Sequence, residues 1–431
     1  MKKHPQPVSI GTSFKITNSF AVAICKNNSK TPKYSYCATI LDNCQTNGYT
    51  VGRNTRRTNH TEKSLSEVSQ LLVVKAIYQG EVIMRKYLLP KEGSFYKANL
   101  HCHTTLSDGK LTPEKIKEMY KNKGYSIVAY SDHDALFCNY HLTDEDFVAL
   151  TAYETSVRND NDPTPHAHRT IIDFCLYAKE PLNIIQVGYH PDSVRWLVDK
   201  GSLTQEEMEN IRYAGDMACM HTYYPGDINK IIKCANENGF LVSMNHPTWA
   251  LMNYNDYSSL KGLWAMEVYN HGCRVIAGMY DSQNVYDDML RCGNKLFCIA
   301  TDDNHNTYPT DSHRSDSFGG FTMIKCNKLD YANVISAMEQ GSFYASTGPE
   351  IYDLYYEEGY VHINCSPAKE ICLTTLGRAG ERVASDNQTP ITHAQFAVDK
   401  DLYKMIRIVV VDENGEKAYT NGYFTEDFME G

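Results

Sequence analysis

Several features are missing from this sequence of 431 residues. No apolar run is long enough to cross a membrane, and residues 1–27 lack the uninterrupted apolar core of a secretory signal peptide. The 14 cysteines are dispersed and form no Cys-x-x-Cys pair, which is typical of a protein from a reducing compartment. We therefore expect a cytoplasmic protein without a membrane partner.

The chain also lacks a basic cluster and a glycine-rich loop of the kind that cradles phosphate groups. Its formal net charge is −10, from 42 basic and 52 acidic residues. This charge argues against a broad surface for duplex nucleic acid, because such a surface needs many cations to neutralise the phosphates. A short or single-stranded nucleic acid that enters a pocket is still compatible with this charge.

Three stretches combine imidazole and carboxylate groups: His101–His103, Ser131–Asp134 and Asp302–His305. Residues i and i+2 of a strand point to the same side, so the two histidines of the first stretch would share one face, as would Asp303 and His305. Histidine together with aspartate or glutamate suits zinc, iron or manganese better than calcium. These stretches predict a metal site.

The same pattern of helix, glycine and apolar strand precedes several of these residues. It predicts a helix from Thr112-Pro113 to Gly124, followed by a strand at 126–130. It predicts a second helix from Asp227 to Gly239 with a strand at 240–244, and a third from Asp281 to Gly293 with a strand at 296–300. Helices that alternate with apolar strands indicate an α/β fold with a parallel sheet, and in a closed barrel the functional residues collect at the carboxyl ends of the strands. Asn245-His246-Pro247 follows one of these strands, as does the third stretch.

Two of three further residues, Glu154 and Asp108, have two interpretations each. Glu154 follows an apolar segment, 147–152, and is either a carboxylate that bridges two ions or a helix cap or salt-bridge partner. Asp108, in Ser107-Asp108-Gly109, is a turn residue or a ligand. Cys102 should point away from its two histidine neighbours and pack as a small core residue.

Taken together and in this order, the motifs resemble those of the polymerase and histidinol phosphatase (PHP) family of metal-dependent phosphoesterases. Asn99–Gly109 resembles the first motif of that family and Ser131-Asp132-His133 the second, and Glu154, Asn245-His246-Pro247 and Asp303-Asn304-His305 resemble the later ones. The resemblance covers about residues 90 to 350. It implies a distorted seven-stranded (β/α) barrel, related to the TIM barrel, that holds two or three divalent ions, most often zinc, manganese or iron.

The resemblance also implies a role for each ligand. One ion would be held by His101, His103, Glu154 and Asp303, a second by Glu154 and His246, and a third by Asp108, His133 and His305.

One ligand of the family does not carry over directly. The family usually has a histidine in the strand after the glutamate, and here Asp173 occupies that position. We favour Asp173 as a ligand because a lone charge in an apolar strand is costly to bury, and His168 is the rival.

Outside the ligands, Asp132, Asp134 and Asp302 are candidates for orienting the imidazoles, or are surface turn residues. Arg314 could clamp a phosphate in a bidentate way, or could be an exposed structural arginine.

The chain is expected to have three parts. Residues 1–83 read as an N-terminal appendage, 84–349 as the barrel and 350–431 as a small antiparallel β domain. In the last part we expect strands at 360–364, 370–375, 393–398 and 405–411, with a hairpin turn at 412–415.

The predicted activity is hydrolysis of a phosphate ester by a metal-activated hydroxide. The substrate would be a small phosphorylated metabolite, a nucleotide or a short single-stranded oligonucleotide. Two alternatives stay open: an amidohydrolase-like enzyme that attacks a C–N or C–O bond, and a metal-binding scaffold without activity.

Overall fold

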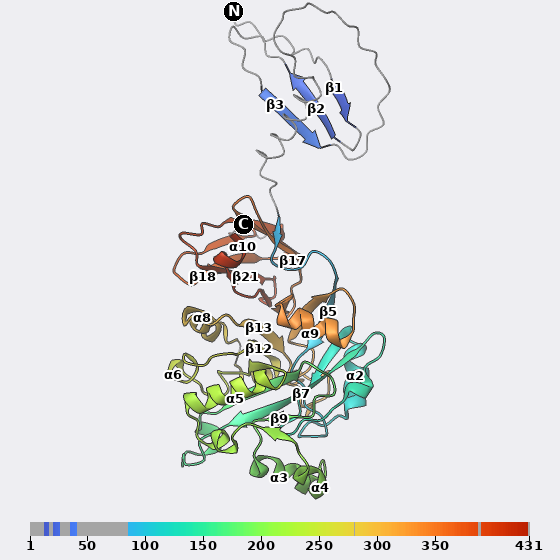
Figure 1. The fold of residues 1–431 in the computed structure, drawn as a ribbon, viewed down its shortest axis with the longest axis vertical. Helices are drawn as coiled ribbons and strands as arrows, with labels where there is room; N and C mark the ends of the chain where they lie inside the picture. The colour runs from blue at the N-terminus through green and yellow to red at the C-terminus, as the bar shows by residue number, and fades with distance from the viewer. Residues whose placement is uncertain are drawn as a thin grey trace, which may run out of the picture. The chain divides into compact units, whose positions relative to one another are not determined.

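The structure is a computed structural model, shown in Figure 1. It describes residues 85–279, 281–386 and 389–429, together with strands β1 (Ser13–Ile16), β2 (Phe20–Cys25) and β3 (Ser35–Ile40). The chain divides into two compact units, 1–79 and 80–431. In the first unit, β1, β2 and β3 form an antiparallel sheet. The rest of the predicted appendage, residues 1–83, lies outside the described residues, and its boundary stays a prediction.

Seven strands make up one half of the large sheet of the second unit, in the order β13-β12-β11-β8-β7-β6-β5. They are β5 (Ser94–Asn99), β6 (Tyr125–Tyr130), β7 (Val148–Val157), β8 (Ile172–Ala178), β11 (Phe240–Met244), β12 (Ala265–Asn270) and β13 (Phe297–Thr301). Strands β5, β6 and β7 run parallel, as do β11, β12 and β13.

Strand β8 departs from the expected parallel sheet, because it pairs antiparallel with both β7 and β11. Between β7 and β8 the chain forms only a short 3-10 turn, η2 (His166–His168), and no crossover helix. A parallel neighbour would need such a crossover, whereas an antiparallel neighbour does not. The expectation of a fully parallel sheet is therefore wrong at this strand.

The three predicted helices are present as α2 (Pro113–Lys121), α5 (Pro225–Glu237) and α8 (Gln283–Arg291). Thr112 caps α2 through its side chain, as predicted. The predicted cap at Asp227 is wrong, because Pro225 starts α5 two residues earlier and leaves Asp227 in the first turn. Gly239 follows α5 with a φ of +81°, a left-handed conformation that glycine adopts without strain.

The remaining helices and short strands connect or follow the strands and helices already named. They are α3 (Pro191–Lys200), α4 (Gln205–Glu209), α6 (Tyr254–Tyr257), α7 (His271–Ala277), α9 (Tyr331–Glu339), α10 (Thr425–Met429), β9 (Gln186–Val187), β10 (Tyr213–Ala214), η1 (Tyr140–Leu142) and η3 (Met217–His221). None of the helices within the described residues has the length and apolar character needed to cross a bilayer.

The two outer strands of the seven are joined beyond their carboxyl ends. The Asp303 N–H donates to the carbonyl of His101 at 2.9 Å, and the His103 N–H donates to the carbonyl of Asn304 at 3.1 Å. The mixed α/β fold is confirmed. The barrel itself stays a prediction, and these two hydrogen bonds favour it because they connect β5 to β13.

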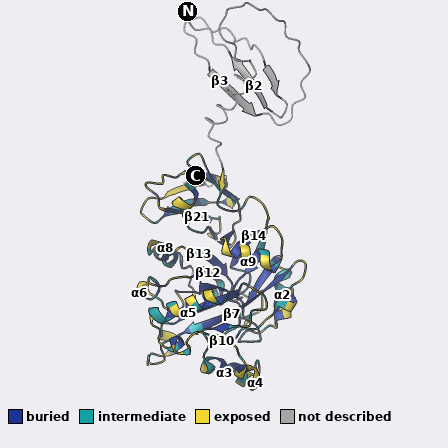
Figure 2. Cartoon of the chain, viewed as in Figure 1, coloured by how far each residue is buried: buried dark blue, intermediate teal, exposed yellow. Residues whose placement is uncertain are grey.

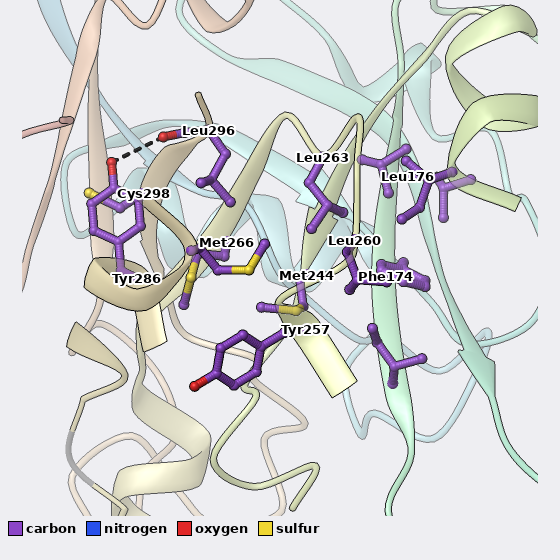
Figure 3. Packing of buried hydrophobic residues seen from close by; sticks show 14 of the residues in the cluster. Phe174, Leu176, Met244, Tyr257, Leu260, Leu263, Met266, Tyr286, Leu296 and Cys298 are labelled. Atoms are coloured by element: carbon purple, nitrogen blue, oxygen red, sulfur yellow. Dashed lines mark hydrogen bonds between the residues drawn. The ribbon is translucent and has the colours of Figure 1, made fainter. Parts of the chain in front are cut away.

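The buried core lies between this sheet and its helices. Figure 3 shows Phe174 of β8 and Met244 of β11 packed with Leu260 and Leu263, and Tyr286 of α8 donating a hydrogen bond to the carbonyl of Leu296 at 3.1 Å. Strands such as β7 and β12 are buried along their length (Figure 2). A charged residue inside these strands must therefore find a partner within the protein.

The C-terminal part is an antiparallel β region, as predicted. The large sheet continues beyond β5 through β14 (Phe321–Cys326), β15 (Phe343–Ser346), β22 (Lys417–Tyr419), β21 (Met405–Val411), β18 (Glu370–Thr375) and β19 (Glu381–Ala384), with β23 (Tyr423–Phe424) beside β21. A second sheet consists of β20 (Ile391–Ala397), β17 (Tyr360–Ala368), β16 (Ile351–Glu357) and β4 (Lys86–Tyr87).

The strands predicted for this region are confirmed, and so is the hairpin turn after β21, where the Asp412 N–H donates to the carbonyl of Glu416 at 3.0 Å. Side chains of the two sheets, such as Ile363 of β17 and Ile408 of β21, belong to one buried cluster. Since β15 pairs with both β14 and β22, the region shares a sheet with the rest of the unit. The boundary at residue 350 stays a prediction.

Candidate metal centre

The centre of the site is the pair of histidines that follows β5. The Nε2 atoms of His101 and His103 lie 3.0 Å apart, and both side chains are fully buried. Asp303, which follows β13, places Oδ1 at 3.3 Å from the first of these nitrogens and at 3.0 Å from the second. Three potential ligand atoms from distant parts of the sequence therefore meet at one point.

Glu154 lies within β7 and contacts four histidines. Its Oε2 is 3.3 Å from His101 Nε2, 3.4 Å from His103 Nε2 and 3.0 Å from His133 Nδ1. Its Oε1 is 3.4 Å from His246 Nε2. Both carboxylate oxygens of Glu154 therefore face imidazoles. This is the arrangement expected of a carboxylate that would bridge two ions.

Asp108, His133 and His305 form the outer side of the cluster. Asp108 Oδ1 lies 3.3 Å from His305 Nε2, 3.8 Å from His133 Nε2 and 3.9 Å from His103 Nδ1. The Asp108 side chain is 46% exposed, whereas His103 is buried. Solvent therefore reaches the cluster from this side.

Three overlapping groups of side chains bring one nitrogen or oxygen atom each to within 4.8 Å of one another. They are His103, Asp108, His133 and His305; His101, His103 and Asp303; and His101, Glu154 and His246. The structure thus brings together eight of the nine predicted ligands. That they bind metal stays a prediction.

The ninth predicted ligand, Asp173, lies at the edge of the cluster. Its Oδ2 is 3.9 Å from His246 Nδ1, and its Oδ1 accepts a hydrogen bond from Ser156 Oγ. Burial, and then the negative charge of Glu154, raise the pKa of Asp173 to about 6. The rival, His168, is exposed on the turn η2.

One buried atom in the cluster lacks a partner. His246 Nδ1 is buried, and no described residue forms a hydrogen bond with it. This nitrogen faces Asp173, whose Oδ2 lies 3.9 Å away, whereas Nε2 of the same ring faces Glu154. It is the donor set of imidazole and carboxylate groups that fits divalent cations.

The imidazoles are strongly perturbed by their surroundings. Burial opposes the protonation of His133 and His246, but the nearby carboxylates outweigh it and raise their pKa values to about 10 and about 9. Burial lowers the pKa of His103 to about 3, with the neighbouring His133 and His305 adding to the effect. In the protein without metal, protons on some histidines therefore supply the positive charge of the cluster.

The carboxylates show the converse effect. Burial would raise the pKa of Glu154, but His101 and His133 hold it well below its usual range. Burial also opposes ionisation of Asp303, and His101 and His103 are among the groups that keep its pKa low. Both carboxylates are thus ionised and available to a cation at neutral pH.

Glu267, in the middle of β12, belongs to the site although the sequence did not predict it. Its Oε1 accepts hydrogen bonds from His101 Nδ1 and Thr301 Oγ1, both at 2.7 Å, and its Oε2 accepts from the His246 N–H at 2.8 Å and Asn270 Nδ2 at 2.9 Å. A carboxylate that fixes the second nitrogen of a ligating histidine orients the ring. The signal was a lone charge in an apolar strand, the same signal that pointed to Asp173.

The aspartates predicted to orient imidazoles do not have that role. Asp132 accepts hydrogen bonds from the backbone N–H groups and hydroxyls of Thr104 and Ser107, and so holds the loop after His103. Asp134 accepts from Trp196 Nε1 at 2.8 Å. All three aspartates fix backbone or neighbouring segments instead, Asp302 by accepting hydrogen bonds from the N–H groups of residues 318–320.

The chain turns sharply after β13. Asp302 accepts hydrogen bonds from the N–H groups of residues 318–320 and from Tyr120 Oη. The next residue, Asp303, has a φ of +52°, a strained conformation outside glycine. The expectation that Asp303 and His305 share a strand face is therefore wrong, although both reach the cluster.

Two further predicted residues have clear positions. Cys102 is buried in an apolar cluster with Ile116 and Val128, which confirms that it points away from the histidines around it. Arg314 is exposed, and its guanidinium lies 4.2 Å from the centre of the Tyr308 ring. Its role as a phosphate clamp stays a prediction.

Comparisons with known proteins give weak similarities only. No protein-family model and no curated protein sequence matches the chain. The solved structures that resemble it include two proteins named as metal-dependent phosphoesterases, one of them as PHP-like.

The first of these is a two-domain protein from Bacteroides vulgatus with a predicted PHP-like metal-dependent phosphoesterase, at a TM-score of 0.37 and 12% identity, over 78% of this chain and 98% of that chain. A protein named as a metal-dependent phosphoesterase from Bifidobacterium adolescentis has a TM-score of 0.30 and 14% identity, over 52% and 91% of the two chains. An amidohydrolase from Chromobacterium violaceum has a TM-score of 0.29 and 15% identity, over 48% and 87%. TM-scores and identities this low do not define a shared function. A function for this chain must therefore be argued from the geometry of the cluster.

Proposed function

We propose that the protein is a metal-dependent phosphoesterase. It would hold two or three divalent ions, of zinc, manganese or iron, and hydrolyse a phosphate ester of a small metabolite, a nucleotide or a short single-stranded oligonucleotide. We also infer that the seven strands close into the distorted barrel, for which the hydrogen bonds between residues 101–103 and 303–304 are the support.

The observation that carries the proposal is the overlap of the three donor groups. His101 belongs to two of them and His103 belongs to two of them. Because the groups share these histidines, the ions that they would hold would lie close together in one cluster. Several adjacent ions suit phosphoryl transfer, because they can hold the oxygens of the phosphoryl group and offset their charge.

The residues divide into those that would hold ions and those that position them. The nine predicted ligands would bind ions, which when bound supply Lewis-acid activation of water and of the phosphoryl group. Glu267 fixes the ring of His101 through Nδ1 and leaves Nε2 facing Glu154 and Asp303. Asp132 holds the loop that leads from His103 to Asp108.

The proposal is tested by a screen of phosphomonoesters, phosphodiesters and amides with zinc, manganese and iron. We expect release of phosphate or of a phosphomonoester that depends on metal and is abolished by His103→Ala. The matched control is His141→Ala, because His141 is an exposed histidine outside the cluster. Circular dichroism of both variants checks that they fold.

Two results would contradict the proposal. Turnover of amides without turnover of any phosphate ester would assign the cluster to C–N hydrolysis. Full phosphoesterase activity in a folded His103→Ala variant would separate the activity from the cluster.

A further inference from the structure

The segment between β8 and α5, residues 179–224, carries two short helices, α3 and α4, which lie below β9 in Figure 1. None of the nine predicted ligands belongs to this segment. Its apolar side chains pack on the chain that follows His133, where Ala135 shares a buried cluster with Val194 and Leu197 of α3. The segment therefore packs against a loop that bears a predicted ligand.

The turn after His133 is strained, and side chains of this segment hold it. Asp134 has a φ of +65°, a left-handed conformation that costs free energy in residues other than glycine. Trp196 of α3 donates its indole N–H to Asp134 Oδ2 at 2.8 Å. Gln186 donates from Nε2 to the Asp134 carbonyl at 2.6 Å and accepts from the Leu136 N–H at 3.3 Å. Since a strained turn persists only where its surroundings fix it, these contacts help to fix His133.

A second contact of α3 reaches a different ligand loop. Lys200, the last residue of α3, donates from Nζ to the Thr105 carbonyl, within the loop that leads from His103 to Asp108. Its ammonium group also lies 3.4 Å from Ser202 Oγ, and it forms no ion pair with a described carboxylate. Helix α3 thus joins the loop of Asp108 to the loop of His133.

Both of these ligands belong to the same donor group, which we call the outer group: His103, Asp108, His133 and His305. Asp108 and His133 are in neither of the other two groups. Within the described residues, no hydrogen bond or ion pair joins α3 to a ligand side chain of those two groups. A change in α3 should therefore affect one donor group and spare the other two.

We propose that α3 positions the outer group, with Trp196 and Lys200 holding the two loops that present His133 and Asp108. One ion of the cluster then depends on α3, and the ions of the other two groups do not. This inference rests on the metal binding of the proposed function and adds a helix that controls part of it. By linkage, an ion in the outer group stabilises the docked helix by the same factor by which the helix strengthens its binding.

The first test counts ions. Metal-free full-length protein is titrated with zinc in competition with a chelating dye, and Asp108→Asn shows which binding step belongs to the outer group. We expect Trp196→Phe and Lys200→Met to weaken the same step by about tenfold or more, the lower end of the range for groups that orient a ligand. The other steps should keep their affinity. Lys200→Arg, which can still donate to the Thr105 carbonyl, should restore native binding.

Each substitution has a matched control. Trp264→Phe removes an indole N–H that donates at the same distance, 2.8 Å, to the Met338 carbonyl. Lys233→Met replaces an exposed lysine of α5 that pairs with Glu237. Neither control should change the zinc affinity of any step. Circular dichroism checks folding, and Lys200→Met keeps the test decisive if Trp196→Phe unfolds the protein, because Lys200 is exposed.

The second test follows the helix instead of the ions. Zinc should slow the hydrogen exchange of residues 191–200 in the full-length protein by about tenfold, the factor that linkage requires. Asp108→Asn leaves every contact of α3 in place, yet it should abolish this protection. A helix with a purely structural role would exchange at the same rate with and without zinc.

Three results would overturn the inference: native zinc affinity in both α3 variants, equal weakening of every step, or no loss of an ion in Asp108→Asn. Each of them can occur in a protein that binds zinc and hydrolyses phosphate esters, so the proposed function would stand. Conversely, the expected zinc results in a protein that hydrolyses no phosphate ester would contradict the proposed function and leave the role of α3 in place. Native protein that takes up no zinc would overturn both.

Discussion

Replacing Glu267 by glutamine tests whether a buried carboxylate organises the metal site. In the native protein Glu267 accepts four hydrogen bonds, at 2.7–2.9 Å, from His101, Thr301, His246 and Asn270. A glutamine has the same shape, but one of its two acceptor oxygens becomes an amino group. That group would face two donors, whichever way the amide is turned.

The expected losses follow from these contacts. An amino group turned toward His246 and Asn270 leaves two buried donors without an acceptor, whereas one turned toward Thr301 and His101 can donate to the hydroxyl oxygen and to a neutral ring. The second arrangement costs less, so the free energy of unfolding should fall by about 1–3 kcal/mol. Metal affinity should fall by about 10–100-fold, because the ring of His101 is no longer held and has lost a negative neighbour. Both effects come from a residue that is not itself a predicted ligand.

The assay has two parts, urea unfolding followed by circular dichroism and zinc titration in competition with a chelating dye. Glu339→Gln is the matched control, because Glu339 is exposed and pairs with Lys179 on the surface. Its effect on stability should stay within about 1 kcal/mol. A folded Glu267→Gln variant with native zinc affinity would refute the reasoning.

Four further predictions follow from the same cluster. Zinc binding at pH 7.5 should release at least two protons, because raised pKa values of about 10 and about 9 keep His133 and His246 protonated without metal, and burial is outweighed by carboxylates that also raise the pKa of His101. An indicator dye in weak buffer measures this release, and none is expected if the cluster binds no metal. Since these pKa values exceed the unfolded value of about 6.5, the stabilisation they give is complete below pH 6.5 and is lost as pH rises through about 9–10. The metal-free protein should thus unfold at lower urea at pH 10 than at pH 6.5. Asp173→Asn should lower the metal content and His168→Ala should not, and elemental analysis showing the reverse would make His168 the ligand. Asp132→Asn should lower the unfolding free energy by about 1–3 kcal/mol and speed proteolysis of residues 104–107, and unchanged cleavage would show that the loop is held by other contacts.

Much of the site could be predicted because its ligands lie next to clear signals for strand ends. His133 and His246 each follow an apolar strand, and a strand fixes the place and direction of the residue that comes after it. Glu154 was predicted at the end of such a strand but lies inside β7. Glu154 still lies in the cluster, because the side chain of a residue within a strand points to one face of the sheet, here the face with the histidines.

Other features depend on contacts between distant parts of the chain. The direction of β8 is set by the lack of a crossover helix and by its pairing with both β7 and β11. The role of Glu267 depends on donors from four separate positions, so its sequence neighbours gave only the hint of a buried charge. For the same reason the aspartates beside the ligands were assigned to the wrong partners, since adjacency in sequence does not define which group a carboxylate accepts from.

The central claim is that the cluster around His103 binds several divalent ions, and the most direct measurement is elemental analysis of full-length protein purified without added metal. His103 belongs to two of the three donor groups. We predict about two or three ions per chain in the native protein, and a loss of at least one in His103→Ala with no loss in His141→Ala. Native protein that contains no transition metal, and that takes up none on dialysis against zinc, manganese or iron, would contradict the account.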